Sequence, residues 1–292
     1  MTFAPSPSPF KPVRGRTTKI LILNPNSSQA MTDGMQAIIN NIQVPYSTEV
    51  HTYTAPPSSP ASINDGHDIQ SSTTAVLSDP AIAKNPELPS IYDGILVACF
   101  SVHPLVPKLQ TLAPTSLKPG AAPAVTGIFE SSVLTALSLL GPSEKWGIVT
   151  TGKFWEDHLS RGVAEFLGFP ADLGDAAPHS KFAGVESTGL NAGDFHHGVD
   201  PAIIRRKLVE ATKRLFESGN KTMNSRTVSG SPVTCIVMGC AGMAGLEEII
   251  RSAASELYGG EFAYKTLHVV DGVRAGIMQI EQTIKHRRLR DQ

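Results

Sequence analysis

Two of the three cysteines in this 292-residue chain stand where a thiol can do chemistry. Cys99 ends an apolar run behind an alanine, and Cys240 lies within the segment GCAGM. Small neighbours let a backbone approach a ligand closely. A cysteine at a strand-to-helix turn also meets unpaired N–H groups that favour its thiolate. A free cysteine is equally a common core residue, and this alternative stays open for either thiol taken alone.

Two thiols in matching places suit one reaction, the movement of a proton between two faces of a carbon. A thiolate removes the proton from a stereocentre beside a carbonyl, and a thiol on the other face returns one. The planar enolate formed between these steps needs N–H donors. We therefore expect Cys99 and Cys240 to be the catalytic pair of a cofactor-independent racemase. Cys235 lies within its apolar run and is expected in the core.

Polar residues follow two other apolar runs, at NPNSS (24–28) and at TTG (150–152). They offer fixed donors and acceptors for a ligand: Asn24, Asn26, Ser27, Thr150 and Thr151. The alternative is that they cap the helices that follow, as Asn, Ser and Thr commonly do. We favour capping for Ser28, and a ligand role for Asn24 and Thr150 at the strand ends.

The elements that must position these residues alternate between β-rich runs and helical patterns, which indicates an α/β fold. Strands are expected at 19–23, 93–100, 123–128, 146–150, 233–239 and 265–270. Helices are expected from the NPNSS turn through Ile39, at 129–140, from about 154, at 245–257 and from 271. Long loops or lids are expected at 171–200 and 218–231, with His196 and His197 as a solvated pair and no metal site.

The order of these features repeats along the chain. KILILNPNSS and KWGIVTTGKF are each a strand that runs into a polar turn, and DGILVACF and VTCIVMGC each bring a cysteine to a strand end. The repeat predicts two related halves that face one cleft, with the ligand beyond the carboxyl ends of parallel strands. We expect a disordered proline-rich tail at 1–16, one lobe at 17–127 plus 268–292, and a second at 128–267.

Composition narrows the classes of partner. A formal net charge of −1 gives no attraction to nucleic acid or to an anionic membrane. No apolar run approaches the roughly 20 residues of a membrane helix. Three cysteines are too few for a disulfide scaffold, and no secretory signal opens the chain, so a cytoplasmic location is expected. We expect a small-molecule substrate and a homo-oligomer.

With these motifs the chain resembles the aspartate/glutamate/hydantoin racemase superfamily, and within it the hydantoin and allantoin racemase branch, including its fungal members. The resemblance rests on ILNPNSS (22–28), DGILVACF (93–100), VTGIFES (125–131), WGIVTTG (146–152) and VMGCAGMAGL (237–246). It implies two pseudo-symmetric Rossmann-like lobes with parallel sheets, an active site in the inter-lobe cleft, no cofactor, and a last helix that returns to the first lobe. It also implies that the ring of the substrate is held by Asn26, Thr150 and Thr151, and by the backbone at Phe100, Ser101, Ala241 and Gly242.

The chain departs from the bacterial pattern after its first cysteine. Bacterial hydantoin racemases tend to read Cys-Phe-Gly-Asp-Pro there, whereas this chain reads CFSVHP at 99–104. The change keeps the cysteine and therefore the proton chemistry, but it leaves the identity of the substrate undetermined. His103 either contacts a ligand or precedes a helix begun by Pro104, and Glu130 receives no chemical role.

The leading hypothesis is racemisation of a 5-substituted hydantoin, with allantoin as the natural candidate in nitrogen metabolism. The alternatives are an amino-acid racemase, a decarboxylase or isomerase on the same scaffold, and a non-catalytic metabolite-binding protein.

Overall fold

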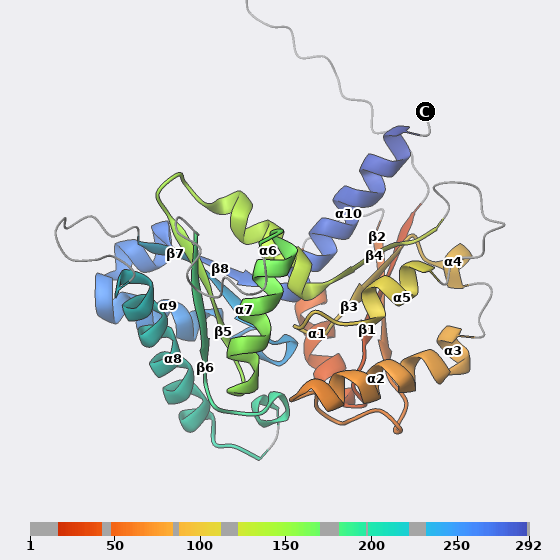
Figure 1. Ribbon diagram of the computed structural model, residues 1–292, viewed down its shortest axis with the longest axis horizontal. Helices are drawn as coiled ribbons and strands as arrows, with labels where there is room; N and C mark the ends of the chain where they lie inside the picture. The colour runs from red at the N-terminus through yellow and green to blue at the C-terminus, as the bar shows by residue number, and fades with distance from the viewer. Residues whose placement is uncertain are drawn as a thin grey trace, which may run out of the picture.

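Two four-stranded parallel sheets form the framework of the protein in a computed structural model of the chain (Figure 1). The structure describes residues 17–42, 48–83, 88–111, 122–169, 181–196, 198–221 and 232–290. The first sheet has the order β2-β1-β3-β4, from β1 (Thr18–Asn24), β2 (Thr48–Thr54), β3 (Gly94–Val97) and β4 (Ala124–Gly127). The second has the order β6-β5-β7-β8, from β5 (Lys145–Thr150), β6 (Phe182–Ser187), β7 (Val233–Gly239) and β8 (His268–Asp271). The two orders correspond strand for strand, so the repeat in the sequence is a repeat in the fold.

Helices connect and cover the strands. They are α1 (Gln29–Asn41), α2 (Gly66–Ser78), α3 (Pro80–Ala83), α4 (Leu88–Ile91), α5 (Leu105–Thr111), α6 (Ile128–Leu139), α7 (Phe154–Phe166), α8 (Pro201–Lys221), α9 (Glu247–Tyr258) and α10 (Gly272–Arg290). Short 3-10 helices, η2 (Ala192–Phe195) and η3 (Ala241–Met243), and a π-helical turn η4 (Phe262–Thr266) complete the described elements. In this part of the chain no helix combines the length and the apolar character that crossing a bilayer requires.

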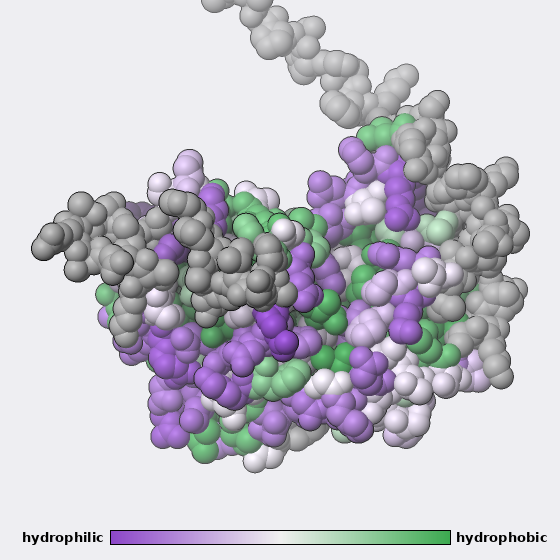
Figure 2. Space-filling view, in the orientation of Figure 1, coloured by the Kyte–Doolittle hydropathy of each residue, from purple (hydrophilic) through white to green (hydrophobic). Residues whose placement is uncertain are grey.

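The two halves are joined by α6, which leads from β4 to β5, and by α10, which returns from β8 to pack along α6 and the first sheet (Figure 1). One apolar core runs through both halves, because it includes Ile22 of the first sheet and Ile148 of the second. Apolar side chains also gather on the surface over α6, where Leu134 is 40% exposed (Figure 2).

Most of the predicted strands and helices are present, with corrected boundaries. Strand β8 pairs with β7, so residues 268–271 belong to the second sheet, and the return to the first lobe begins only with α10. The predicted strand at 265–270 is shorter than expected because its first residues form the π-helical turn. The helix predicted from Gly245 begins at Glu247, because Gly245 has a positive φ of 86°.

The two predicted long loops contain regular structure. Residues 182–187 form β6, an edge strand whose residues are mostly half-buried, and therefore it lacks the continuous apolar run of a central strand. Helix α8 extends to Lys221 and includes the start of the second loop. The rest of both loops (170–180 and 222–231), His197 and the tail at 1–16 lie outside the described residues.

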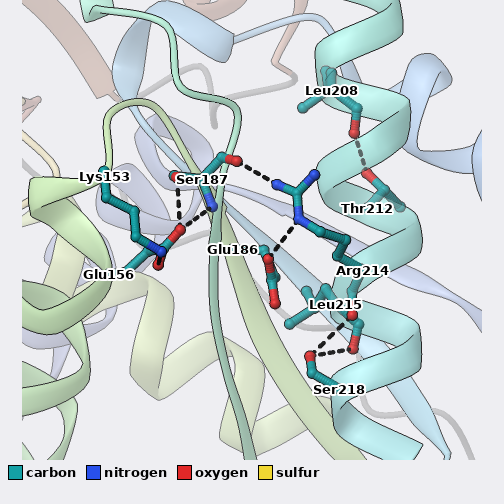
Figure 3. A network of polar contacts seen from close by, with 9 residues as sticks. All are labelled: Lys153, Glu156, Glu186, Ser187, Leu208, Thr212, Arg214, Leu215 and Ser218. Atoms are coloured by element: carbon teal, nitrogen blue, oxygen red, sulfur yellow. Dashed lines mark hydrogen bonds and ion pairs between the residues drawn. The ribbon is translucent and has the colours of Figure 1, made fainter.

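The carboxyl end of β6 is held by side chains from two helices (Figure 3). Glu156 of α7 accepts hydrogen bonds from the Ser187 amide at 3.2 Å and from the Ser187 hydroxyl at 2.6 Å. Arg214 of α8 donates to the Ser187 carbonyl at 2.6 Å and pairs with Glu186 at 2.9 Å. This network fixes the point from which residues 188–196 run toward the cleft.

Candidate active site

Cys99 and Cys240 come from different lobes and line one cleft. Cys99 lies two residues beyond the end of β3, and Cys240 directly follows β7, the equivalent strand of the second sheet. Of the predicted site residues, those that line the cleft are Asn26, Cys99, Phe100, Thr151, Cys240, Ala241 and Gly242. The fold therefore brings the two thiols together through its internal repeat.

The Cys99 thiol sits in a packed environment with one hydrogen-bond donor. Burial raises its pKa to about 12, and the negative charges of Cys240 and Glu130 act in the same direction. The Ser101 hydroxyl opposes this shift by donating to the Cys99 sulfur at 3.4 Å. Ser101 itself is fully buried.

The Cys240 thiol caps the short helix η3. Its sulfur accepts a hydrogen bond from the Gly242 amide at 3.3 Å. Burial raises the pKa of Cys240 to about 11, while the amides of Gly242 and Met243 lower it. Backbone N–H groups aimed at the sulfur stabilise a thiolate, and here they offset part of the upward pKa shift that burial causes.

Some side chains of the NPNSS turn stabilise the turn and the helix after it, and one lines the cleft. The Asn24 amide donates to Asn26 Oδ1 and to Thr32 Oγ1, both at 3.0 Å, and Asn24 does not line the cleft. Asn26 does, and its Nδ2 donates to the Met31 sulfur at 3.1 Å. A thioether is a weak acceptor, so a ligand carbonyl can replace it. Ser28 caps α1 by accepting from the Met31 amide, which confirms its predicted role.

Three further predicted ligand residues have structural partners. Ser27 donates to the Ser59 carbonyl at 2.9 Å, and Thr150 donates to the Gly239 carbonyl at 2.8 Å. Neither residue lines the cleft, and nor does Ser101. Contact of these three residues and Asn24 with substrate stays a prediction, and in this structure each side chain supports the residues around the thiols.

His103 is a buried structural residue. Its Nδ1 accepts a hydrogen bond from the Leu105 amide at 3.3 Å, and its Nε2 lies 3.2 Å from the Ser72 hydroxyl of α2. Burial lowers its pKa to about 3, so the ring is neutral. Of the two alternatives from the sequence, the structure supports a residue that precedes a helix, since α5 begins at Leu105.

Several residues of the cleft were not predicted from the sequence. Met31, Ile63 and Trp155 add apolar side chains, and Ala192 enters the cleft from η2. Met31 and Trp155 lie in the first turns of α1 and α7, directly after the two polar turns. Their position after these turns is visible in the sequence and could have identified them. Ala192 and Ile63 lie in connecting segments and have no such signal.

His196 differs from its prediction as a solvated loop residue. The side chain is half-buried, and its Nε2 is shielded from solvent. A Cβ atom placed on Gly242 would lie 3.2 Å from this Nε2, so the ring packs against the turn that follows Cys240.

The cleft is narrow and uncharged. None of the side chains that line it within the described residues carries a formal charge, apart from any charge on the thiols. Its volume is about 30 Å³. A cavity of that size holds about two water molecules, so a ring-shaped ligand requires the lobes to separate or side chains to move.

Comparison with known proteins identifies the family to which this chain is similar. The family model for Asp/Glu/hydantoin racemases matches residues 20–280. An uncharacterized protein of Schizosaccharomyces pombe is 29% identical over 268 residues, covering 91% of this chain and 92% of its own.

The solved structures that share the fold include two allantoin racemases. Allantoin racemase from Klebsiella pneumoniae superposes with a TM-score of 0.63 at 24% identity, covering 92% of this chain and 88% of its own. Allantoin racemase from Pseudomonas fluorescens gives a TM-score of 0.62 at 21% identity, covering 92% and 91%. At these identities the likeness establishes the two-lobed architecture.

Proposed function

Because this chain belongs to the Asp/Glu/hydantoin racemase family, a group of isomerases, we propose that it racemises a 5-substituted hydantoin by proton transfer between Cys99 and Cys240. One observation carries the proposal. Two thiols from equivalent strands of the two lobes line the same uncharged cleft.

The lack of charge on the cleft walls favours a neutral ring over an amino acid or a dicarboxylate. A buried carboxylate or ammonium group needs a charged or strongly hydrogen-bonding partner. The described lining supplies an amide from Asn26, a hydroxyl from Thr151 and backbone groups near the thiols. These suit the carbonyl and N–H edges of a cyclic imide, which carries no formal charge.

The basicity of the thiols suits the same chemistry. Burial raises the pKa of Cys99 to about 12 and that of Cys240 to about 11, which makes either thiolate a stronger base than an exposed one. The C5 proton of a hydantoin is comparatively acidic because the adjacent ring carbonyl takes up the charge. One thiolate removes this proton, the ring passes through a planar enolate, and the opposite thiol delivers its own proton to the other face.

Donors near the thiols hold the enolate. The Asn26 amide, now directed at the weak Met31 acceptor, donates to a ring carbonyl. Hydrogen bonds that strengthen as the oxygen gains charge lower the barrier to its formation. We propose allantoin as the first substrate to test, because the two similar structures described above are allantoin racemases.

The test follows single enantiomers of allantoin and of 5-benzylhydantoin by circular dichroism in D2O. We expect the optical signal to decay faster than in the enzyme-free blank, with one deuterium entering at C5. Cys99→Ser and Cys240→Ser each abolish racemisation. Cys235→Ser, which changes a buried β7 cysteine outside the cleft, is the matched control and retains activity.

Near-normal racemisation by either cleft variant would contradict the two-thiol mechanism. If the wild-type protein leaves both hydantoins unchanged, malonate and maleate analogues become the next substrates.

A further inference from the structure

The imidazole of His196 lies between two glycines from different lobes. A Cβ atom placed on Gly34 of α1 would lie 3.2 Å from His196 Cε1. One placed on Gly242 would lie 3.2 Å from His196 Nε2, 3.4 Å from the Cys240 sulfur and 3.1 Å from the Ala192 carbonyl oxygen. The ring nitrogen and the sulfur therefore border the same small space above Gly242, on the wall of the cleft.

The segment that carries His196 is fastened to both lobes. Its start is tied to the end of β5, because the Thr188 amide donates to the Thr150 carbonyl at 2.9 Å and the Gly189 amide to the Thr151 carbonyl at 2.8 Å. Its middle, η2, is tied to the first lobe, because the Ala192 amide donates to Asn64 Oδ1 at 3.3 Å and the Gly193 amide to the Ser62 hydroxyl at 3.2 Å. Hydrogen bonds to both lobes thus hold the imidazole near Cys240.

We propose that His196 is the proton-transfer partner of Cys240, a positioning residue that generates the thiolate in the closed cleft. The inference rests on the proposed function, in which Cys240 is one of the two bases. Histidine suits the role because its ordinary pKa lies close to neutrality.

The step is a single proton transfer. The S–H bond of Cys240 breaks and leaves its electron pair on sulfur, and an N–H bond forms at His196 Nε2. The products are a thiolate and an imidazolium, which stabilise each other across the space above Gly242. This requires the neutral imidazole to carry its proton on Nδ1. The transfer proceeds directly after a small movement, or through one water.

Other titratable groups near this pair have partners elsewhere. Asp33 on α1 accepts a hydrogen bond from Gln29, and Asp194 on η2 accepts one from the Asn191 amide. Across the cleft, the negative charges of Cys240 and Glu130 both act on Cys99. Of these groups, His196 and Cys240 are the two with atoms within 3.4 Å of the Cβ position on Gly242.

The test measures the alkylation of each cysteine by iodoacetamide as a function of pH, with the sites separated by peptide mass spectrometry. In His196→Asn we expect the titration of Cys240 to move upward by at least one pH unit, with alkylation about tenfold slower near pH 7.5. The titration of Cys99 stays in place within the same sample. His268→Asn, which removes an exposed histidine at the start of β8, is the control and changes neither profile.

An unchanged Cys240 titration in His196→Asn would overturn the proposal, and so would an equal shift of both cysteines, which indicates general loosening of the cleft. Gly34→Ala gives a second approach that keeps the histidine. Its added methyl group displaces the ring, and we expect a smaller shift of Cys240 in the same direction.

Alkylation needs no substrate, so this result is independent of the proposed reaction. If the wild-type protein does not turn over hydantoins but its Cys240 titration depends on His196, the proposed substrate is wrong. The pairing of His196 with Cys240 is then still supported.

Discussion

The side chain of Asn64 in the first lobe accepts a hydrogen bond from the backbone amide of Ala192 in the second, at 3.3 Å. Beside it, Ser62 accepts from the Gly193 amide at 3.2 Å. The loop with Asn64 follows β2 and the loop with Ala192 follows β6, so equivalent loops of the two related halves hold each other across the cleft. We call these two hydrogen bonds the inter-lobe clasp.

Removal of the inter-lobe clasp is expected to open the cleft. In the double variant Ser62→Ala/Asn64→Ala the open state becomes more populated, since each net hydrogen bond contributes about 1 kcal/mol. Iodoacetamide should then alkylate Cys99 several-fold faster at one fixed pH, as followed by peptide mass spectrometry. Ser58→Ala, an exposed serine of the same loop, is the control. Equal rates in the double variant and the wild type would show that the clasp does not govern access.

The hydrogen bond from Thr150 to the Gly239 carbonyl is expected to hold Cys240 in position. Thr150→Val keeps the shape of the side chain and removes the donor, which leaves a buried carbonyl without this partner. We expect a loss of about 1–2 kcal/mol in the free energy of unfolding, measured in urea, together with slower racemisation. Thr150→Ser retains the donor and most of the activity.

Thr234→Val is the matched control for this variant. Thr234 is also a buried threonine, on β7, but its hydroxyl has no hydrogen-bond partner within the described part of the chain. The substitution should therefore leave stability unchanged or raise it. A similar loss in both variants would mean that the Thr150 hydrogen bond has no special role.

The carboxylate of Glu130 is expected to tune Cys99. Burial raises the pKa of Glu130, and its negative charge contributes to the raised pKa of Cys99. Glu130→Gln removes this charge, so the pKa of Cys99 falls and its alkylation becomes faster at a given alkaline pH. Cys240 serves as the internal reference in the same digest. A Cys99 titration that does not move would show that Glu130 is too well screened to act on the thiol.

His103 is expected to make the protein less stable in mild acid. Its pKa is about 3 in the folded protein, compared with an ordinary value of 6.5. Between these values the unfolded chain binds a proton that the folded chain does not, so stability is lost as the pH falls. From pH 7 to pH 5 the loss amounts to about 2 kcal/mol.

His103→Gln removes this titration and should flatten the dependence of unfolding free energy on pH over that range, whatever its effect at neutral pH. His51→Gln, at an exposed position on β2, is the comparison. A pH dependence as steep in His103→Gln as in the wild type would assign the acid sensitivity to other groups.

The sequence by itself was enough to predict the α/β class and the two related halves. Buried strands such as 19–23 and 233–239 are mostly apolar, and such runs can be recognised because a strand covered on both faces needs apolar residues along most of its length. The position of each cysteine just beyond an apolar run was readable in the same way. Strand β6 was missed because an edge strand needs no such run.

Only the tertiary structure decided which polar side chains reach the cleft. Asn24 and Asn26 are two residues apart and look alike in the sequence, yet Asn24 is held inside the turn and Asn26 lines the cleft. The difference depends on the direction of each side chain from its backbone, which is set by packing against α1. His196 lies 44 residues before Cys240 in the chain, and no local pattern connects them. Their proximity arises because β6 and β7 flank β5 in one sheet, and the loops that follow these strands converge at its carboxyl edge.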